Sequence, residues 1–296
     1  MVKVESFLRS IRRHYPDVPL SPVKEIGSGQ NNVILQVGSD IIFRFPRYAA
    51  GIEQLKLEVQ LLSIISKYVS LKVPYPTYRV LDTNNETHAF MGYIRIEGEP
   101  LDADGLNQIE NYADKQRIAD QLSDFLMELH QIDLGHFSNC LAVNKYDPFQ
   151  EWRDLYDHIK KKLYPFMTEE ACRRTDRHFT DFFACEKSAA IIPSIIHGDF
   201  GTSNILYDKS SHRITGIIDF GSAHVGDPAI DYAALLASYG VDFFQLIEKR
   251  LPEVKSMIER VLFYKGTFAL QEALFGLEHD DPIAFTNGIT AINTFD

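Results

Sequence analysis

The sequence predicts an α+β fold in which a small antiparallel sheet precedes a larger, mainly helical region. Short apolar runs separated by turn residues gather between Val23 and Ile94. Helical periodicity dominates from Leu106 onward, and one pair of short strands interrupts it near residue 210. Because strands and helices occupy separate stretches of the chain, the pattern indicates an α+β fold.

The first part of the chain is expected to hold two helices and five strands. An amphipathic helix over residues 3–14 ends near Pro16, and a second helix covers residues 52–68. Turn residues at Gly29–Asn32 and Gly38–Asp40 separate the first three strands as an antiparallel meander. The expected strands cover residues 23–27, 33–37, 41–45, 77–81 and 89–94.

A turn at Gly98-Glu99-Pro100 divides the sequence into two expected domains, residues 1–97 and 98–296. The second is mainly helical, and its helix over residues 113–131 should form the buried centre. Asp227-Pro228 is a typical start for a further helix. The other expected helices cover residues 149–163, 169–187, 243–251, 253–277 and 282–294.

The composition is that of an ordinary globular protein of 296 residues, with 45% hydrophobic, 24% charged and 12% aromatic residues. Its net charge of −11 argues against nucleic acid or an anionic membrane as a partner, because both would be repelled. The same charge is compatible with a small cationic molecule. We therefore expect a protein that binds small molecules. The expected oligomeric state is a monomer.

Three cysteines, Cys140, Cys172 and Cys185, show no C-x-x-C spacing, so neither a disulfide framework nor a zinc site is indicated. The first residues are interrupted by charges and lack the apolar core of a signal peptide. No apolar stretch approaches the roughly 20 residues that cross a bilayer. A reducing cytoplasm is the expected location.

The chemistry is concentrated between His197 and Gly221. The expected strand pair, residues 204–207 and 214–218, brings the loop before its first strand close to the loop after its second. Asp199 on the first loop can accept a proton from a hydroxyl group. Asn204 and Asp219 offer the hard oxygen ligands that Mg²⁺ prefers. This is the minimum equipment for transferring a phosphoryl group.

The same block resembles the kinase catalytic set, in which an Asp and an Asn four or five residues apart precede Asp-Phe-Gly. His197-Gly198-Asp199, Asp219-Phe220-Gly221 and Gly226–Asp231 together resemble the aminoglycoside phosphotransferase and choline kinase branch of the protein-kinase-like fold. Within it, IIFRFPR (residues 41–47) and GYIRIEGEPL (residues 92–101) look most like the aminoglycoside 2''-phosphotransferases. The resemblance implies a bilobal fold and the use of ATP or GTP with Mg²⁺.

The resemblance also implies a nucleotide site on the N-terminal lobe. Arg44 stands where the family has a lysine that touches phosphates, and Glu58, or its rival Glu53, is the expected partner on the next helix. Guanidinium differs from ammonium in reach and geometry, so Arg44 is a departure from the family pattern. The other expected contacts are a covering loop with Gly27, Ser28 and Gly29, a purine-facing linker with Met91, Tyr93 and Ile94, and Ile218 beside the metal site.

The C-terminal helices should wall the acceptor pocket. A negative rim that suits a polyamine sugar is formed by Glu272, Glu278, Asp280 and Asp281. Phe268 and Gln271 align with a Trp and a Glu of the 2''-phosphotransferases, which weakens the aminoglycoside assignment. Asp199 and Asp231 complete the expected acceptor contacts, and Asp231 has a second possible role in holding the backbone of the catalytic loop. His130 and His197 are expected to be structural.

The predicted function is transfer of the γ-phosphoryl group of ATP or GTP to a hydroxyl of a small cationic acceptor, with an aminoglycoside first. One alternative is a kinase of another metabolite, of the choline, homoserine, methylthioribose or fructosamine type. A second is a pseudokinase that binds nucleotide, which Arg44 and the thin glycine loop suggest. A third is a slow Mg²⁺-dependent hydrolase of nucleoside triphosphates.

Overall fold

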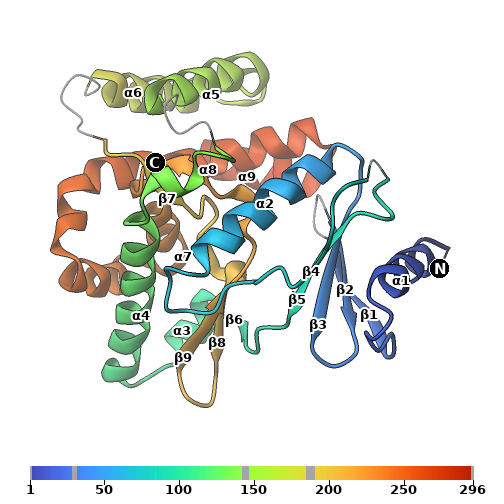
Figure 1. Ribbon diagram of the computed structural model, residues 1–296. Coiled ribbons are helices and arrows are strands. Elements are labelled where there is room, and N and C mark those ends of the chain that lie inside the picture. Colours follow the sequence, from blue (N-terminus) through green and yellow to red (C-terminus); the bar gives the residue numbers. More distant parts are fainter. Residues whose placement is uncertain (1, 29–31, 84, 142–146, 185–190, 295–296) are drawn as a thin grey trace.

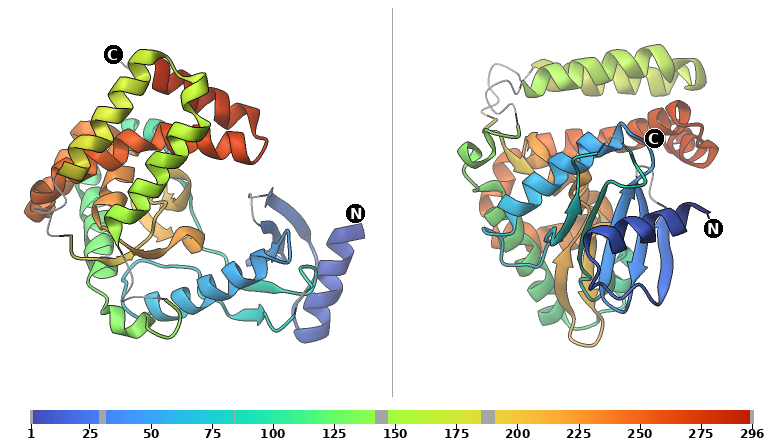
Figure 2. Two further views of the ribbon diagram at one scale, coloured as in Figure 1. Left: turned by 90° about the horizontal axis from the view of Figure 1, so that it is seen from above. Right: turned by 45° about the vertical axis from the view of Figure 1, so that its right-hand side comes forward.

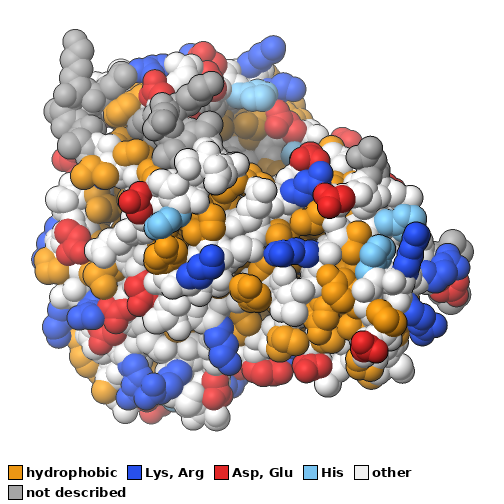
Figure 3. Space-filling view, viewed as in Figure 1, with side chains coloured by type: hydrophobic (Ala, Val, Ile, Leu, Met, Phe, Trp, Pro, Cys, Tyr) orange, Lys and Arg blue, Asp and Glu red, His pale blue; other side chains and the backbone are white. Residues whose placement is uncertain are grey.

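The computed structural model describes residues 2–28, 32–83, 85–141, 147–184 and 191–294. Gly29 of the expected covering loop and Cys185 lie outside these ranges. The ribbon has two lobes, a sheet with two helices and a larger helical lobe (Figure 1). The expected α+β fold is confirmed. Acidic and basic side chains are interspersed over the face seen in Figure 3.

The N-terminal lobe contains an antiparallel sheet with strand order β1-β2-β3-β5-β4. Its helices are α1 (Val2–His14) and α2 (Gly51–Ile65). All five expected strands are present: β1 (Val23–Ser28), β2 (Asn32–Val37), β3 (Ile41–Pro46), β4 (Tyr78–Val80) and β5 (Phe90–Ile94).

Strand β3 is buried along its whole length because a helix covers each face of the sheet. Phe43 and Phe45 belong to one core with Phe7 of α1, whose ring stacks on Phe45 at 4.1 Å. Ile42 packs instead with α2 and the C-terminal lobe. Successive side chains of a strand point to opposite faces, so Arg44 lies on the same side as Ile42, toward α2.

The C-terminal lobe is mainly helical around two small sheets. Strands β6 (Glu99–Pro100), β8 (Ile205–Asp208) and β9 (Arg213–Ile217) form one sheet, and β7 (Ser194–Ile196) pairs with β10 (His224–Gly226). The hairpin β8–β9 confirms the expected strand pair. The helices are α3 (Ala103–Asn107), α4 (Tyr112–His130), α5 (Pro148–Lys162), α6 (Glu169–Ala184), α7 (Ala229–Arg250), α8 (Ile258–Glu278) and α9 (Pro282–Thr294).

Two expected helices near the C-terminus have different bounds in the structure. The helix expected over residues 243–251 is the end of α7, which starts at Ala229 and is broken at Gly240, where φ is 76°. The helix expected over residues 253–277 starts only at Ile258, because Pro252–Met257 forms a tighter 3₁₀ segment. Figure 2 shows α5 and α6 as a pair on the outer side of α8 and α9.

The central helix α4 is buried as expected, with Leu122, Phe125 and Leu126 fully enclosed. The expected division at residue 97 stays a prediction, and β6 just after it pairs with β8 of the C-terminal lobe. Among the described residues, no helix is both long enough and apolar enough to span a membrane.

Candidate active site

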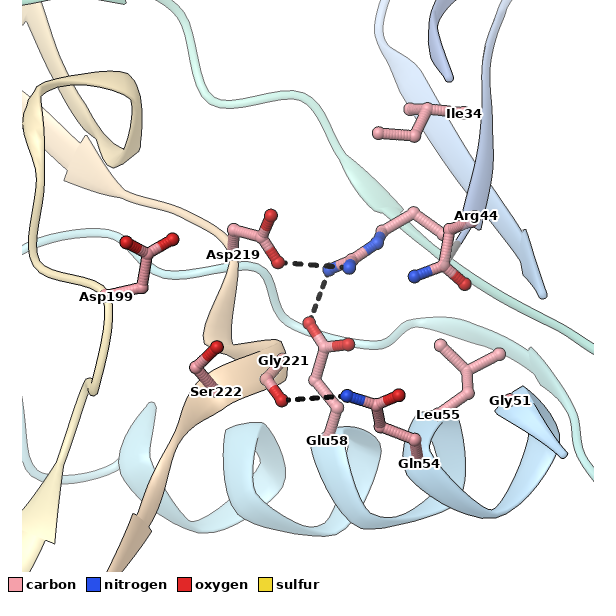
Figure 4. Close-up of a pocket in the computed structure, with 11 residues that line it drawn as sticks. Ile34, Arg44, Gly51, Gln54, Leu55, Glu58, Asp199, Asp219, Gly221 and Ser222 are labelled. Atoms are coloured by element: carbon pink, nitrogen blue, oxygen red, sulfur yellow. Dashed lines mark hydrogen bonds and ion pairs between the residues drawn. The ribbon is translucent and has the colours of Figure 1, made fainter. Parts of the chain in front are cut away.

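A cleft of about 930 Å³ brings the predicted catalytic block against the N-terminal sheet and helix α2. Asp199 and Asp219 line it from one side, and Arg44 and Glu58 line it from the other (Figure 4). The two sides are far apart in sequence, since Arg44 and Asp219 are separated by 175 residues. The remaining lining residues are Asn32, Ile34, Gly51, Gln54, Leu55, Gly221 and Ser222.

Arg44 connects three elements through its guanidinium group. Nη1 donates a hydrogen bond to Glu58 Oε1 on α2, and Nη2 lies 3.1 Å from Asp219 Oδ1. Arg44 and Glu58 are buried, whereas the Asp219 side chain is 50% exposed. Burial by itself lowers the pKa of Arg44, but the carboxylates of Glu58 and Asp219 raise it above its ordinary value. Arg44 therefore stays charged inside the cleft.

Glu58 is confirmed as the partner of Arg44, and its rival Glu53 is not. The Glu53 side chain is 77% exposed and pairs with Lys56 at 2.7 Å. Glu58 lies between buried positions of α2, on the face that meets the sheet. The side chains of residues five apart on a helix point in different directions, so only one of the two can reach Arg44.

Asp199 stands at the front of the catalytic loop, between β7 and a 3₁₀ turn over Thr202–Asn204. Its carboxylate is exposed, and Asn204 behind it is buried. Asn204 Nδ2 donates to the Asp199 carbonyl at 2.8 Å and to Asp199 Oδ2 at 2.9 Å. These bonds fix the orientation of the carboxylate while leaving it open to the cleft.

Asp231 holds the back of the same loop. Its carboxylate accepts hydrogen bonds from the backbone N–H groups of His197 and Gly198, both at 2.9 Å, and contacts His130 Nε2 at 2.9 Å. Burial alone would raise the pKa of Asp231, but the hydrogen bond and charge of His130 and the neighbouring His197 hold it below its usual value.

The expected loop-holding role of Asp231 is thereby confirmed, and its expected acceptor contact is wrong. Asp231 is 0% exposed, and His130 and the loop backbone surround its two oxygens. A carboxylate enclosed in this way has no surface left for a substrate amine. His130 is correspondingly a structural histidine, as expected.

The Asp-Phe-Gly segment packs against His197 and Gly198 and restricts which side chains fit there. The His197 ring lies 4.6 Å from the Phe220 ring, and its Nε2 donates to the Ile218 carbonyl at 3.0 Å. Gly198 has φ of +77°, and a Cβ atom there would lie 2.4 Å from the Ser222 carbonyl oxygen. Only glycine fits this position, because both the backbone angle and the space exclude a side chain.

The purine-facing linker does not lie over Met91 and Gly92 as expected. Met91 is paired with Arg44 of β3 and Arg79 of β4, so neighbouring strands occupy both of its sides. The pairing of β4 with β5 stops at Tyr78, which lies opposite Gly92. From Tyr93 onward, β4 no longer covers that edge of β5. Tyr93 and Ile94 thus remain candidates, and burial raises the pKa of Tyr93 to about 12.

The other nucleotide candidates are placed as follows. Gly27 and Ser28 end strand β1 opposite Ile34 and Val33 of β2, on the side where Ile34 lines the cleft. Ile218 is half-buried, and its N–H donates to the Asn204 carbonyl at 2.9 Å. This bond ties Asn204 to the residue before Asp219.

None of the expected acceptor contacts on α8 lines the cleft. Phe268 packs on the core, and Gln271 Nε2 donates to Thr267 Oγ1 at 2.9 Å. Glu272 is exposed, and Glu278 pairs with His158 of α5 at 3.0 Å. Their role in acceptor binding stays a prediction.

Three polar residues of the cleft were missed by the sequence analysis: Asn32, Gln54 and Ser222. Gln54 Nε2 donates to the Gly221 carbonyl at 3.3 Å and so joins α2 to the Asp-Phe-Gly segment. Its position four residues before Glu58 places both on one helix face, which was the available signal. Asn32 and Ser222 gave no signal beyond that of ordinary turn residues.

Asn204 and Asp219 fit a divalent cation. The Asn204 amide nitrogen is engaged by Asp199, which leaves its carbonyl oxygen as the atom able to bind a metal. Among the described residues, Asp219 contacts Arg44 through Oδ1, and no contact of Oδ2 competes with a metal. Within the described ranges, three or more His, Cys, Asp or Glu residues nowhere group as a metal site. Phosphate oxygens and water would have to complete the coordination.

Comparison with known families decides the class of protein. The model of the phosphotransferase enzyme family matches residues 22–252. The chain belongs to this family. The kinase-like resemblance inferred from the sequence is confirmed, and the protein is a phosphotransferase.

The proteins that this chain resembles are named after different antibiotics. Viomycin phosphotransferase of Streptomyces vinaceus is 25% identical over 265 residues, which are 86% of this chain and 87% of that protein. The structure of an aminoglycoside 2''-phosphotransferase with GDP and kanamycin is 26% identical, with a TM-score of 0.87 over 97% of this chain and 96% of that one. A macrolide 2'-phosphotransferase type I shares the fold at 17% identity, with a TM-score of 0.76 over 99% and 97% of the two chains.

Proposed function

We propose that this phosphotransferase moves the γ-phosphoryl group of ATP or GTP to a hydroxyl of a small polycationic antibiotic, most simply an aminoglycoside. One observation carries the proposal: exposed Asp199 and half-exposed Asp219 face the buried Arg44–Glu58 pair across one cleft. The similar enzyme that binds GDP and kanamycin supports the choice of ligands. The net charge of −11 suits a cationic acceptor.

Four residues in and around the cleft have a part in the proposed transfer. Asp199 accepts the proton of the acceptor hydroxyl, whose oxygen forms a bond to the γ-phosphorus while the bond to the β–γ bridging oxygen breaks. The nucleoside diphosphate leaves with that oxygen. Arg44 steadies the phosphates, and Asn204 keeps Asp199 aimed at the hydroxyl. Asp231 holds the loop that carries Asp199.

The proposed metal is Mg²⁺, bound by Asn204 and Asp219, and it would neutralise charge on the phosphate oxygens. Because Asp219 also contacts Arg44, one carboxylate would hold both the metal and the guanidinium group that is proposed to orient the phosphates. The donor nucleotide would lie between the proposed lobes, residues 1–97 and 98–296, with its base near Tyr93 and Ile94. We propose a monomeric, cytoplasmic enzyme.

The acceptor pocket is proposed on the outer side of the catalytic loop. Asp102, Asp104, Thr202 and Ser238 line a shallow depression there, and Thr202 belongs to the same loop as Asp199. Its two carboxylates suit the amines of a cationic acceptor. Helix α8, with Phe268 and Gln271, would contribute more distant contacts.

A cationic peptide antibiotic of the viomycin type is the second candidate acceptor. The observation that favours it is the similarity to viomycin phosphotransferase over 86% of the chain. Phe268 and Gln271, in place of the family Trp and Glu, also remove two features expected for aminoglycoside binding.

Turnover of ATP and GTP across a panel of acceptors tests the proposal. The panel contains kanamycin, gentamicin, viomycin, choline, homoserine, methylthioribose and a fructosamine, and Asp199→Asn serves as the control enzyme. Saturable turnover on an aminoglycoside, lost in the control, is the expected result.

Other outcomes assign the alternatives. Turnover on choline or another metabolite alone would contradict an antibiotic acceptor. Diphosphate release that no acceptor accelerates would indicate a hydrolase. Nucleotide binding without any turnover would indicate a pseudokinase.

A further inference from the structure

A second cavity lies between helices α6, α8 and α9, and no step of the proposed transfer uses it. It holds about 850 Å³ and is open to solvent on one side. Arg174 and His178 line it from α6, Lys265 from α8, and Ile292 from α9. It shares no lining residue with the cleft that contains Asp199.

Helix α8 keeps this cavity apart from the predicted acceptor contacts. Lys265 and Leu270 face the cavity. Successive residues of a helix turn by roughly 100°, so Phe268 and Gln271 point to a different side of α8. A ligand in the cavity would therefore not occupy the acceptor site.

Within the part of the chain that the structure describes, no acidic side chain pairs with the positive charge of the lining. Arg174 donates to the Ile292 carbonyl at 2.8 Å, which orders its guanidinium but neutralises nothing. Lys265 has no ion pair within the described residues. No Asp or Glu is among the lining residues. Glu170, one turn before Arg174, is bound to Arg173 at 2.7 Å, and Asp181 is exposed.

His178 forms a wall of the cavity and not a third cation. Its Nε2 donates to the Phe263 carbonyl at 2.9 Å, and its ring stacks on the Phe263 ring at 4.8 Å. Gly266 makes room for the ring, because a Cβ atom there would lie 2.6 Å from it. Burial lowers the pKa of His178, so its imidazole is neutral at pH 7. The positive charge thus rests on Arg174 and Lys265.

The rest of the lining is mainly apolar, with Ala269, Leu270 and Ile292 among its members, and Thr175 adds one hydroxyl group. An ordered guanidinium binds a carboxylate through paired hydrogen bonds, and an ammonium group adds a second charge. Aliphatic walls gain from covering a hydrocarbon chain. A ligand that satisfies both parts of the lining has an anionic head and an apolar body.

We propose that this cavity binds a small aliphatic monocarboxylate, with its head between Arg174 and Lys265 and its chain against Leu270 and Ile292. Bound there, the ligand joins α6, α8 and α9 and stabilises the folded protein by mass action. The proposal does not depend on the proposed phosphotransfer reaction, because the two sites share no residue.

Trp152 provides a signal for binding, since it is the only tryptophan of the chain. Its ring lies 5.5 Å from the Phe263 ring, and the Phe263 ring stacks in turn on the ring of His178, which lines the cavity. Titration of the full-length protein with octanoate should change Trp152 fluorescence saturably and raise the melting temperature. Octylammonium, which has the same chain and the opposite charge, should do neither at equal concentration.

Variants locate the site. Arg174→Met and Lys265→Met should each weaken octanoate binding by about tenfold, which corresponds to about 1.4 kcal/mol. Lys255→Met, at an exposed lysine just before α8, should bind as the wild type does. Asp199→Asn should also bind octanoate normally, and saturating GDP should not displace it, which separates this cavity from the cleft.

Three results would overturn the proposal: no saturable signal in the wild type, equal binding of octylammonium, or unchanged affinity in both folded variants. Circular dichroism and the melting temperature without ligand establish folding. If either variant does not fold, the comparison of octanoate with octylammonium on the wild type decides.

Discussion

Asp199 and Asp231 lie on the front and the back of one catalytic loop. Both are aspartates, but Asp199 is exposed to the cleft and Asp231 is buried against the backbone of the loop. Asp199 is exposed and receives one side-chain hydrogen bond, from Asn204. Asp231 is fully buried and is bound by two backbone N–H groups and His130. The Asp199 carboxylate remains accessible to a substrate, whereas the oxygens of Asp231 are occupied by hydrogen bonds within the protein. Burial and hydrogen bonding, and not residue type, therefore distinguish the proposed catalytic aspartate from the structural one.

Removing the back carboxylate should have the largest effect. Asp231→Ala leaves the N–H groups of His197 and Gly198 buried without an acceptor, and we expect the free energy of unfolding to fall by about 4 kcal/mol. Urea unfolding measures this loss. A change below about 1 kcal/mol would mean that water replaces the carboxylate.

Alanine substitutions at Gly198 and Gly240 compare a crowded glycine of the loop with an uncrowded one elsewhere. The two residues have nearly the same φ, +77° and +76°, but different surroundings. A Cβ at Gly198 would lie 2.4 Å from the Ser222 carbonyl oxygen, whereas none of the described atoms lies within 4 Å at Gly240. Gly198→Ala should cost about 4 kcal/mol of unfolding free energy. Gly240→Ala should cost about 2 kcal/mol from backbone strain alone, because a φ of 76° with a ψ of −179° is rarely adopted by residues other than glycine. Equal losses in thermal or urea unfolding would contradict the steric argument.

Removing the front carboxylate should affect turnover and not stability. Asp199→Asn is expected to lower turnover by roughly 100-fold or more, since a positioned general base is lost. Nucleotide affinity, measured by titration calorimetry, should stay within about threefold, and the melting temperature should hold. Wild-type turnover in this variant would remove Asp199 from its proposed role.

Glu58 and Glu53 on α2 form a matched pair for the donor side of the cleft. Glu58→Gln removes the buried counter-charge of Arg44, so we expect the KM for the nucleotide to rise about tenfold as the guanidinium shifts toward Asp219. Glu53→Gln, at a side chain that is 77% exposed, should change neither KM nor stability. Similar KM values in the two variants would indicate that the ion pair does not orient the phosphates.

The smallest effect concerns pH. The pKa of Asp231 is lowered in the folded protein, so its charge stabilises the fold above the ordinary Asp pKa of about 4, and this contribution fades as pH falls below that value. The difference in unfolding free energy between the wild type and Asp231→Asn should therefore be smaller at about pH 3.5 than at about pH 6. A difference that grows on acidification would reverse the assigned direction.

Much of the fold was predictable because its signals are local. The five strands, the hairpin β8–β9 and helix α4 follow from the spacing of apolar residues over a few turns or strand repeats. Predictions failed where neighbouring sequence does not set the outcome. The sequence around Met91 is typical of a strand, but it does not show how many neighbours that strand has. In the structure Met91 is paired with both β3 and β4 and so does not belong to an open linker.

The sequence by itself determined the order of the elements, and it was enough to predict Asp199, Asn204 and Asp219 as the residues for phosphoryl transfer. Only the tertiary structure decided that Glu58 pairs with Arg44, that Asp231 faces inward, and that Gln54 reaches Gly221. These contacts join residues that are 14, 34 and 167 positions apart in the chain. Periodicity acts over a few residues, whereas burial and charge pairing depend on which surfaces the folded chain brings together.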